Sequence, residues 1–249
     1  GIAATESEYV GFCDGDDLWE PEKLAEHVVF LDANPDVGLT YSGSLLIDVN
    51  GQPTGLAQTP KAGCVAPRDV LLRNPVGNGS APVIRRACLD DIVFRPQGDT
   101  RDQWFDETFR QSEDIDCWVR IALMTSWRIA GTDEPLTRYR IVPSGLSANL
   151  MKQYETWTRV ADRVAQISPE FARAHVPAAK AYQLRYLARR AVTLGAGRTA
   201  CALMAKSLMT SLHPLFHEPI KTLTTIGAST MLVLGGERLV RRALGGQPA

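Results

Sequence analysis

The sequence has few cysteines and histidines, and it has no apolar run long enough to cross a membrane. Its five cysteines are odd in number, far apart and without a Cys-x-x-Cys pair, which argues against a disulfide framework and favours a reduced, cytoplasmic compartment. His213 and His217 have helical spacing, but Pro214 stands between them without an acidic partner, so zinc is not expected. The longest uncharged run, residues 222–236, is shorter than the roughly 20 residues of a spanning helix. It could still lie on a membrane surface.

Other features are also missing. There is neither a phosphate-binding glycine loop nor a serine nucleophile elbow, which removes two large classes of enzyme. The chain begins on Gly1 without an initiating Met or a signal peptide, close to an apolar strand, which indicates a fragment.

The charges are divided unevenly along the 249 residues. Residues 1–170 carry 16 Lys and Arg against 26 Asp and Glu, whereas residues 171–249 carry 11 against 2. An acidic front and a basic back indicate two modules, the second suited to anionic surroundings. Nucleic acid is not an expected partner, because the acidic module would repel phosphates and no aromatic stacking platform is evident.

Three carboxylates follow the apolar run 9–13 within four positions, at Asp14, Asp16 and Asp17. We expect that run to be a buried strand of a parallel sheet, with the carboxylates at its ligand-binding carboxyl end. Like charges this close are costly unless a cation offsets them, and oxygen ligands suit Mg²⁺ or Mn²⁺. The alternative is an acidic turn in which Asp17 caps the following helix.

The next segments predict a βαβ unit. A helix from Pro21 should end at Asn34-Pro35 and lead into a strand over 37–42, with an inward stripe at Leu24, Val28 and Leu31. Asn50-Gly51 predicts a hairpin turn, residues 52–66 a loop, and Pro67 a short helix to Arg73. Strands are expected over 81–85, 127–130 and 136–141.

A second acidic group stands at the start of another predicted helix. Ser112 is a candidate N-cap, and Glu113 and Asp114 complement the helix dipole in the first turn. The apolar positions of this helix keep one face, at Ile115, Trp118, Val119, Ala122 and Leu123. The carboxylates are either helix-starting residues or groups that face the first acidic cluster.

Four motifs therefore follow one another over residues 1 to about 150. In chain order they are Asp14-Gly15-Asp16-Asp17 with Pro21, Ser112-Glu113-Asp114 with Trp118 and Arg120, Glu134-Pro135-Leu136 with Tyr139-Arg140, and Leu146-Ser147. In this order the chain resembles the family 2 glycosyltransferases of the GT-A fold. The resemblance implies an α/β, Rossmann-like mixed sheet that lacks its first βα elements, followed by a C-terminal helical region. The implied boundaries are 1–150 for a partial glycosyltransferase domain and 151–249 for the helices.

The resemblance also implies site roles. Asp14 would contact the nucleotide part of the donor and share the metal with Asp16, the main ligand of Mn²⁺ or Mg²⁺. Asp17 would support them. Asp114 would be the general base, with Glu113 its neighbour. Tyr139 and Arg140 would line the donor diphosphate, and Ser80 would lie near the acceptor pocket.

The implied reaction is inverting transfer of a sugar from a nucleotide-diphosphate sugar to a hydroxyl of a glycan or lipid-linked acceptor, in polysaccharide or cell-surface glycan assembly. Two departures limit it: the family's donor-binding first strand and helix are absent, and Val142 stands where many relatives have a histidine. Two alternatives remain, a phosphohydrolase with Asp14 as nucleophile and Asp16 as acid, and a catalytically silent carbohydrate-binding or scaffold module. Because of the first departure, the chain alone should bind a nucleotide sugar poorly. Sugar donor, acceptor, oligomeric state and the activity of the chain without the missing donor-binding segment are left open.

Residues 151–249 show helical periodicity, for example at Trp157, Val160, Val164 and Ile167. Pro169, Pro177, Pro214 and Pro219 are expected at breaks or first turns. Two basic clusters stand on helices, at Arg185, Arg189 and Arg190 and at Arg238, Arg241 and Arg242. They form either a solvated face or a dock for anionic lipid, which would place a cytoplasmic enzyme at the inner face of the cell membrane.

Overall fold

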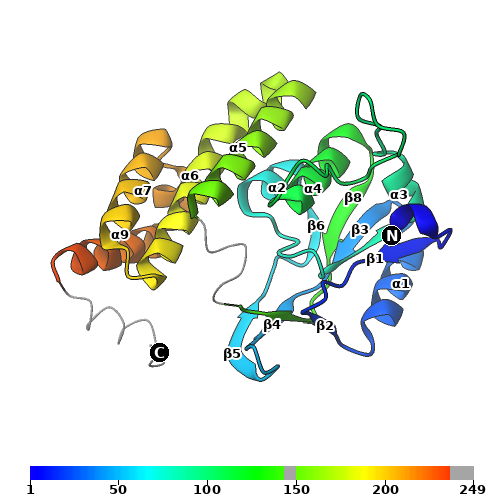
Figure 1. Ribbon diagram of the computed structural model, residues 1–249, viewed down its shortest axis with the longest axis horizontal. Coiled ribbons are helices and arrows are strands. Elements are labelled where there is room, and N and C mark those ends of the chain that lie inside the picture. Colours follow the sequence, from blue (N-terminus) through cyan, green and yellow to red (C-terminus); the bar gives the residue numbers. More distant parts are fainter. Residues whose placement is uncertain (143–149, 236–249) are drawn as a thin grey trace. The chain divides into compact units, whose positions relative to one another are not determined.

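The computed structural model describes residues 1–142 and 150–235. The chain divides into two compact units, Gly1–Ala148 and Asn149–Ala249, and Figure 1 shows strands only in the first. Leu146-Ser147 and the basic cluster at Arg238, Arg241 and Arg242 lie outside the described residues. The predicted class, a mixed α/β part followed by a helical region, is confirmed.

The larger sheet of the first unit has the strand order β1-β7-β3-β8-β6. Its strands are β1 (Tyr9–Gly11), β3 (Val37–Tyr41), β6 (Gly63–Val65), β7 (Pro82–Arg85) and β8 (Arg128–Gly131). β7 is antiparallel to both β1 and β3, and β3 is parallel to β8. The prediction that the first strand joins a parallel neighbour is wrong, because β7 lies between β1 and β3. Only Val10 of β1 is buried, and the strand ends at Gly11 rather than Cys13.

A second sheet has the order β2-β9-β4-β5, with β2 (Leu18–Trp19), β4 (Ser44–Ile47), β5 (Pro53–Gln58) and β9 (Thr137–Arg140). β4 and β5 form the predicted hairpin, and Gly51 at its turn has a φ of 80° that suits glycine. The predicted loop over 52–66 is wrong, because β5 and β6 occupy most of it. Its glycines and prolines are tolerated since β5 is largely exposed.

Helix α1 (Lys23–Ala33) lies on one side of the larger sheet, and α2 (Pro67–Arg73) and α4 (Glu113–Met124) lie on the other, with α3 (Arg86–Asp90) after β7 (Figure 1). The predicted inward stripe of α1, at Leu24, Val28 and Leu31, is only partly confirmed. Leu31 is buried, but Leu24 is 50% exposed, and the other buried positions are Lys23 and His27. The helix rests on the core cluster of Leu31, Val37, Val83 and Ala130.

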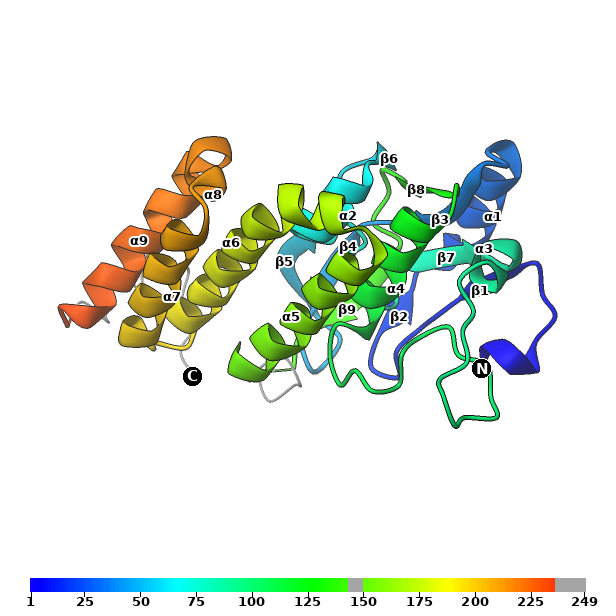
Figure 2. The same ribbon diagram turned by 90° about the horizontal axis from the view of Figure 1, so that it is seen from above.

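The second unit consists, over its described part, of α5 (Leu150–Ile167), α6 (Pro169–Thr193), α7 (Gly197–Thr210), α8 (His213–His217) and α9 (Pro219–Val233). In Figure 2, α7 packs between α6 and α9. Pro169, Pro214 and Pro219 stand in first turns as predicted, but Pro177 lies inside α6 and does not end it.

The basic cluster on α6 is also corrected. Arg185 is 3% exposed, and its guanidinium donates to Glu218 and to Thr222 Oγ1, the latter at 2.8 Å. It therefore ties α6 to α8 and α9 instead of facing solvent. Arg189 is exposed, as the solvated-face alternative requires.

In the part of the chain that the structure describes, no helix combines the length and apolar character that crossing a membrane would require.

Candidate active site

The acidic segment forms a turn directly after β1. The N–H of Asp17 donates to Asp14 O at 3.0 Å, which closes the turn and leaves Asp14 and Asp16 exposed. Gly11 allows the strand to approach this turn, because a Cβ there would lie 2.7 Å from the indole of Trp19. The chain therefore presents two of the three carboxylates to solvent at the end of a strand.

Asp17 has a different position from its neighbours. It is 6% exposed, and its two carboxylate oxygens accept hydrogen bonds from different elements. Oδ1 accepts the backbone N–H of Arg140 at 2.9 Å, and Oδ2 accepts the Ser80 hydroxyl at 2.7 Å. Burial raises the pKa of Asp17, and these two hydrogen bonds oppose the rise. Asp17 thus joins the turn to β9 and to the segment before β7, and the α1 N-cap is Glu22 instead.

Ser80 lies beneath the turn. Its hydroxyl also accepts the N–H of Asp14 at 2.9 Å, and the residue is fully buried. The adjacent Gly79 is in contact with the carboxylate of Asp14, since a Cβ there would be 3.5 Å from Oδ2. Ser80 therefore orients the acidic turn, whereas its predicted place near an acceptor stays a prediction.

Arg140 holds the other side of the turn. Its Nε donates to Asp16 O at 2.7 Å, and its Nη1 donates to Asp48 O at 2.8 Å and Val49 O at 3.1 Å. The guanidinium thus bridges the acidic turn and the β4–β5 hairpin. Tyr139, which precedes it on β9, is partly exposed. Contact of either side chain with a diphosphate stays a prediction.

Glu113 and Asp114 begin α4. Ser112 stands at the N-cap as predicted, but its φ is 63° and its side chain makes no capping hydrogen bond. The predicted inward face of the helix is only partly confirmed: Trp118 and Val119 are buried, whereas Ile115, Ala122 and Leu123 are partly exposed. Asp116 and Arg120 are also buried, and they form an ion pair at 3.0 Å.

Burial raises the pKa of Asp114 to about 6. Hydrogen bonds from the N–H of Ile115 and from the side chain of Asn74 lower this pKa and partly offset the effect of burial. Asn74 follows α2 in a left-handed conformation with a φ of 40°. Asn74 is a site residue that the sequence pattern missed, because nothing in the local sequence shows that α2 ends beside α4.

The two acidic groups influence each other. Although Asp14 is exposed, its pKa is raised first by the partial desolvation of its carboxylate and then by the charges of Asp16 and Glu113. Glu113 also raises the pKa of Asp114. Phe12 and Trp118 each stack edge-on against Phe105, which links the end of β1 to α4. The structure therefore brings the carboxylates of the acidic turn and of the α4 start into one neighbourhood.

The residues present suit a hard cation that is shared with a ligand. Within residues 1–142 and 150–235, no three His, Cys, Asp or Glu side chains are arranged to hold a metal by themselves. Asp14 and Asp16 supply two exposed carboxylates, and Mg²⁺ characteristically uses one or two carboxylates with substrate phosphates and water. Asp14 and Asp16 are therefore the residues that could hold such an ion, together with a phosphate ligand and water.

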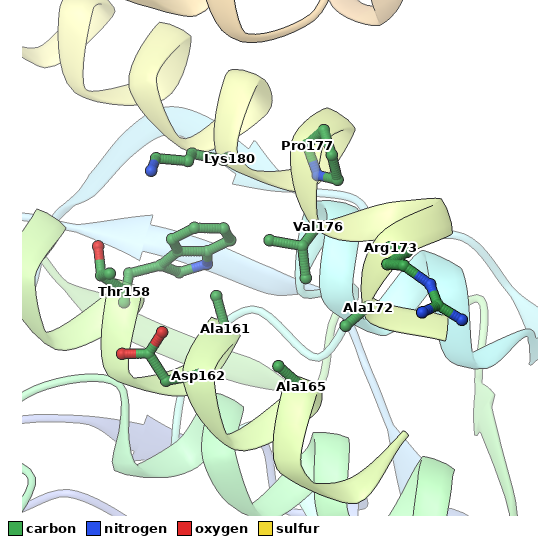
Figure 3. Close-up of a pocket in the computed structure, with 10 residues that line it drawn as sticks. Thr158, Ala161, Asp162, Ala165, Ala172, Arg173, Val176, Pro177 and Lys180 are labelled. Atoms are coloured by element: carbon green, nitrogen blue, oxygen red, sulfur yellow. The ribbon is translucent and has the colours of Figure 1, made fainter. Parts of the chain in front are cut away.

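A cavity of about 320 Å³ lies elsewhere, between α5 and α6 (Figure 3). Its lining is mainly apolar and includes Ala161, Ala165, Val176 and Pro177. Its charged members are Asp162, Arg173 and Lys180. None of the predicted site residues lines it, so it does not belong to the acidic site.

Comparisons with known proteins agree with this arrangement at the level of fold. No family model matches the sequence, and a search of curated proteins gave no match. Among solved structures, the chain is similar to the crystal structure of S. aureus TarS, residues 1–349, in complex with UDP. The similarity has a TM-score of 0.50 and 20% identity, and covers 94% of this chain and 69% of the TarS chain. The similarity shows that the chain shares its fold with this UDP-bound structure.

Proposed function

We propose that this chain carries the catalytic residues of a metal-dependent, inverting glycosyltransferase that uses a nucleotide-diphosphate sugar. The observation that carries the proposal is the meeting of two acidic groups, the turn with Asp14 and Asp16 and the α4 start with Glu113 and Asp114. The fold supports it, because the similar TarS structure holds UDP. Sugar transfer needs both a base for the acceptor and charge compensation for the departing diphosphate.

Asp114 is the proposed general base. Its raised pKa of about 6 leaves it largely ionised at neutral pH while giving it more affinity for a proton than an ordinary Asp. An acceptor hydroxyl would lose its proton to this carboxylate as its oxygen forms the bond to the anomeric carbon. The bond between that carbon and the diphosphate breaks in the same displacement, so the anomeric configuration inverts. The negative charge of Glu113 lies beside this base and, after burial, contributes to the raised pKa of Asp114.

Asp16 and Asp14 would hold Mn²⁺ or Mg²⁺, which would neutralise charge on the diphosphate leaving group. Val142 offers no ligand, so water and the diphosphate would fill the remaining positions. Asp14, nearer to Gly79 and Ser80, would also contact the nucleotide. Tyr139 and Arg140 would stand beside the diphosphate from β9.

UDP in the TarS structure makes a uridine nucleotide the first donor to examine. The proposed acceptor is a glycan or a lipid-linked sugar of polysaccharide or cell-surface assembly, which the family resemblance suggests. Ser80 is buried and would not touch the acceptor itself. It would influence acceptor binding only by holding the acidic turn in place.

The proposal is tested by assaying donor turnover with a panel of nucleotide sugars and Mn²⁺. Asp114→Ala should lower turnover by about 10²–10⁴-fold, the usual contribution of a general base. Asp16→Ala should remove the dependence on Mn²⁺, and the exposed Asp133→Ala serves as a matched control with unchanged turnover.

Unchanged turnover in both site variants would refute the proposal. A covalent phosphate trapped on Asp14 would show the phosphohydrolase alternative instead. Binding of nucleotide or glycan without turnover in the unmodified protein would show a silent module.

A further inference from the structure

Helix α9 buries polar residues and exposes apolar ones. Its inward positions Thr222, Thr225 and Ser229 are 0%, 5% and 1% exposed. Their hydroxyls donate to backbone carbonyls. Thr225 and Ser229, for example, each donate to the carbonyl oxygen four residues earlier in the helix, at 2.6 Å. Hydroxyls paired in this way need no outside partner, so they can line a contact between helices.

The inward face packs closely against α7. A Cβ placed on Gly197 would come within 2.6 Å of the Cβ of Leu232, so the two helices approach at a position where only glycine fits. Ile226 and Leu232 pack beside this contact on the core cluster that contains Leu203 and Met204. The small residue at this contact lets the two helices approach closely.

The opposite side of α9 carries large apolar side chains. We call this set the outer apolar face, and its members are Ile220 (78% exposed), Leu223 (57%), Met231 (43%) and Leu234 (80%). Their positions i, i+3, i+11 and i+14 fall on one side of a helix, with Gly227 between them. Phe216, at the end of α8, adds a 73% exposed ring just before α9. Large exposed apolar residues that share one side of a helix favour a docking site.

The charge of the sequence that contains α9 favours an anionic partner. Residues 196–249 contain six Lys and Arg against two Glu and no Asp. Of the two acids, Glu218 is engaged by the buried Arg185 and by Lys221, which lies 3.3 Å away. A second copy of the chain docking face to face would bring like charges together, whereas anionic lipid head groups would complement them.

We propose that the outer apolar face of α9 docks on an anionic lipid bilayer, with its apolar side chains at the boundary between head groups and acyl chains. Nearby cations, such as Lys221 on α9 and the exposed Arg198 at the start of α7, would contact the head groups. The inference does not depend on the proposed glycosyl transfer, because it concerns residues of the helical unit alone.

Flotation of the whole chain with vesicles tests the proposal. Vesicles of phosphatidylcholine with added phosphatidylglycerol should carry the protein, and raised salt should weaken the binding. The double variant I220E/L223E should bind these vesicles at least roughly tenfold more weakly, because it places charge at the apolar boundary. The matched control is V29E/L56E, whose positions are 66% and 63% exposed in the other unit, and it should bind like the unmodified protein.

Circular dichroism and thermal melting establish that both double variants are folded. Failure of the unmodified protein to float, or equal binding by both double variants, would overturn the proposal. So would binding to pure phosphatidylcholine that equals binding to the anionic vesicles. Light scattering measures the oligomeric state. If the unmodified protein is a dimer that I220E/L223E abolishes, and does not bind vesicles, the outer apolar face would be assigned to a second copy and the proposal would be contradicted.

Discussion

Lys23 shows how strongly a single residue can depend on its surroundings. Its ammonium is fully buried and has three neutral partners, Ala81 O at 2.7 Å, Ser42 Oγ at 3.2 Å and His27 Nε2 at 3.3 Å. Burial lowers the pKa of Lys23 to about 7 and, with the Lys23 charge, that of His27 to about 3. His27 is therefore a neutral acceptor that donates from Nδ1 toward Thr40. The sequence could not predict this, because a lysine at the start of a helix is ordinarily exposed.

This burial predicts a pH effect on stability. Between pH 7 and pH 10.5 the unfolded chain holds a proton on Lys23 that the folded chain releases, so the Lys23 contribution to the free energy of unfolding rises with pH. Relative to Lys23→Met, the unmodified protein should gain on the order of 2 kcal/mol between pH 7 and pH 9. Denaturant unfolding at both pH values measures it, and the comparison cancels the shared effect of buried thiols.

The exposed Lys152→Met serves as the control and should show no such change. A constant difference between the unmodified protein and Lys23→Met across this pH range would contradict the prediction.

At the scale of the element, the acidic turn is held by partners far away in the sequence. Ser80, 63 residues from Asp17, and Arg140, 123 residues from it, both donate to its carboxylate. The pattern of three aspartates indicated a shared site, and it indicated that Asp17 supports the others. Which elements hold the turn could not be predicted, because pairing at this sequence separation depends on the sheet order, in particular on β7 beside β1.

Removal of the Ser80 hydroxyl tests this support. Ser80→Ala leaves the N–H of Asp14 and one oxygen of Asp17 without a partner, so it should lower the free energy of unfolding by about 1–3 kcal/mol. It should also weaken Mn²⁺-dependent nucleotide binding, since the turn loses an anchor. Denaturant unfolding and titration calorimetry measure the two effects. Ser7→Ala, at an exposed position, is the control, and equal behaviour of the two variants would argue against a supporting role for Ser80.

Helix periodicity succeeded in locating helices and failed on their orientation. The pattern predicted α1, α2 and α4 close to their observed positions, because caps, prolines and apolar spacing are local signals. It placed Leu24 inside, although Lys23 and His27 fill that face. In α9 the same reasoning would bury Ile220 and Leu223, whereas Thr222 and Thr225 face inward. Apolar spacing shows that a helix has two faces, and only the packing partners decide which one is buried.

At the scale of the molecule, the two units carry different properties. The acidic site belongs entirely to the first unit, and the outer apolar face belongs entirely to the second. The uneven charge of the sequence reflected this division, and the order of motifs indicated the fold class. The uncharged run 222–236 indicated that this segment could lie on a membrane surface. It did not predict the outer apolar face, because a run of small and apolar residues does not show which of them face outward.

The central claim is that Asp114 acts as the base of glycosyl transfer, and the pH dependence of turnover tests it most directly. With a donor that the protein turns over, the rate should fall about tenfold per pH unit below pH 6, as Asp114 becomes protonated. In Asp114→Asn this limb should disappear and the rate should drop at least about 100-fold, while nucleotide affinity with Mn²⁺ stays unchanged. Equal rates and equal pH profiles for the two proteins would contradict the account.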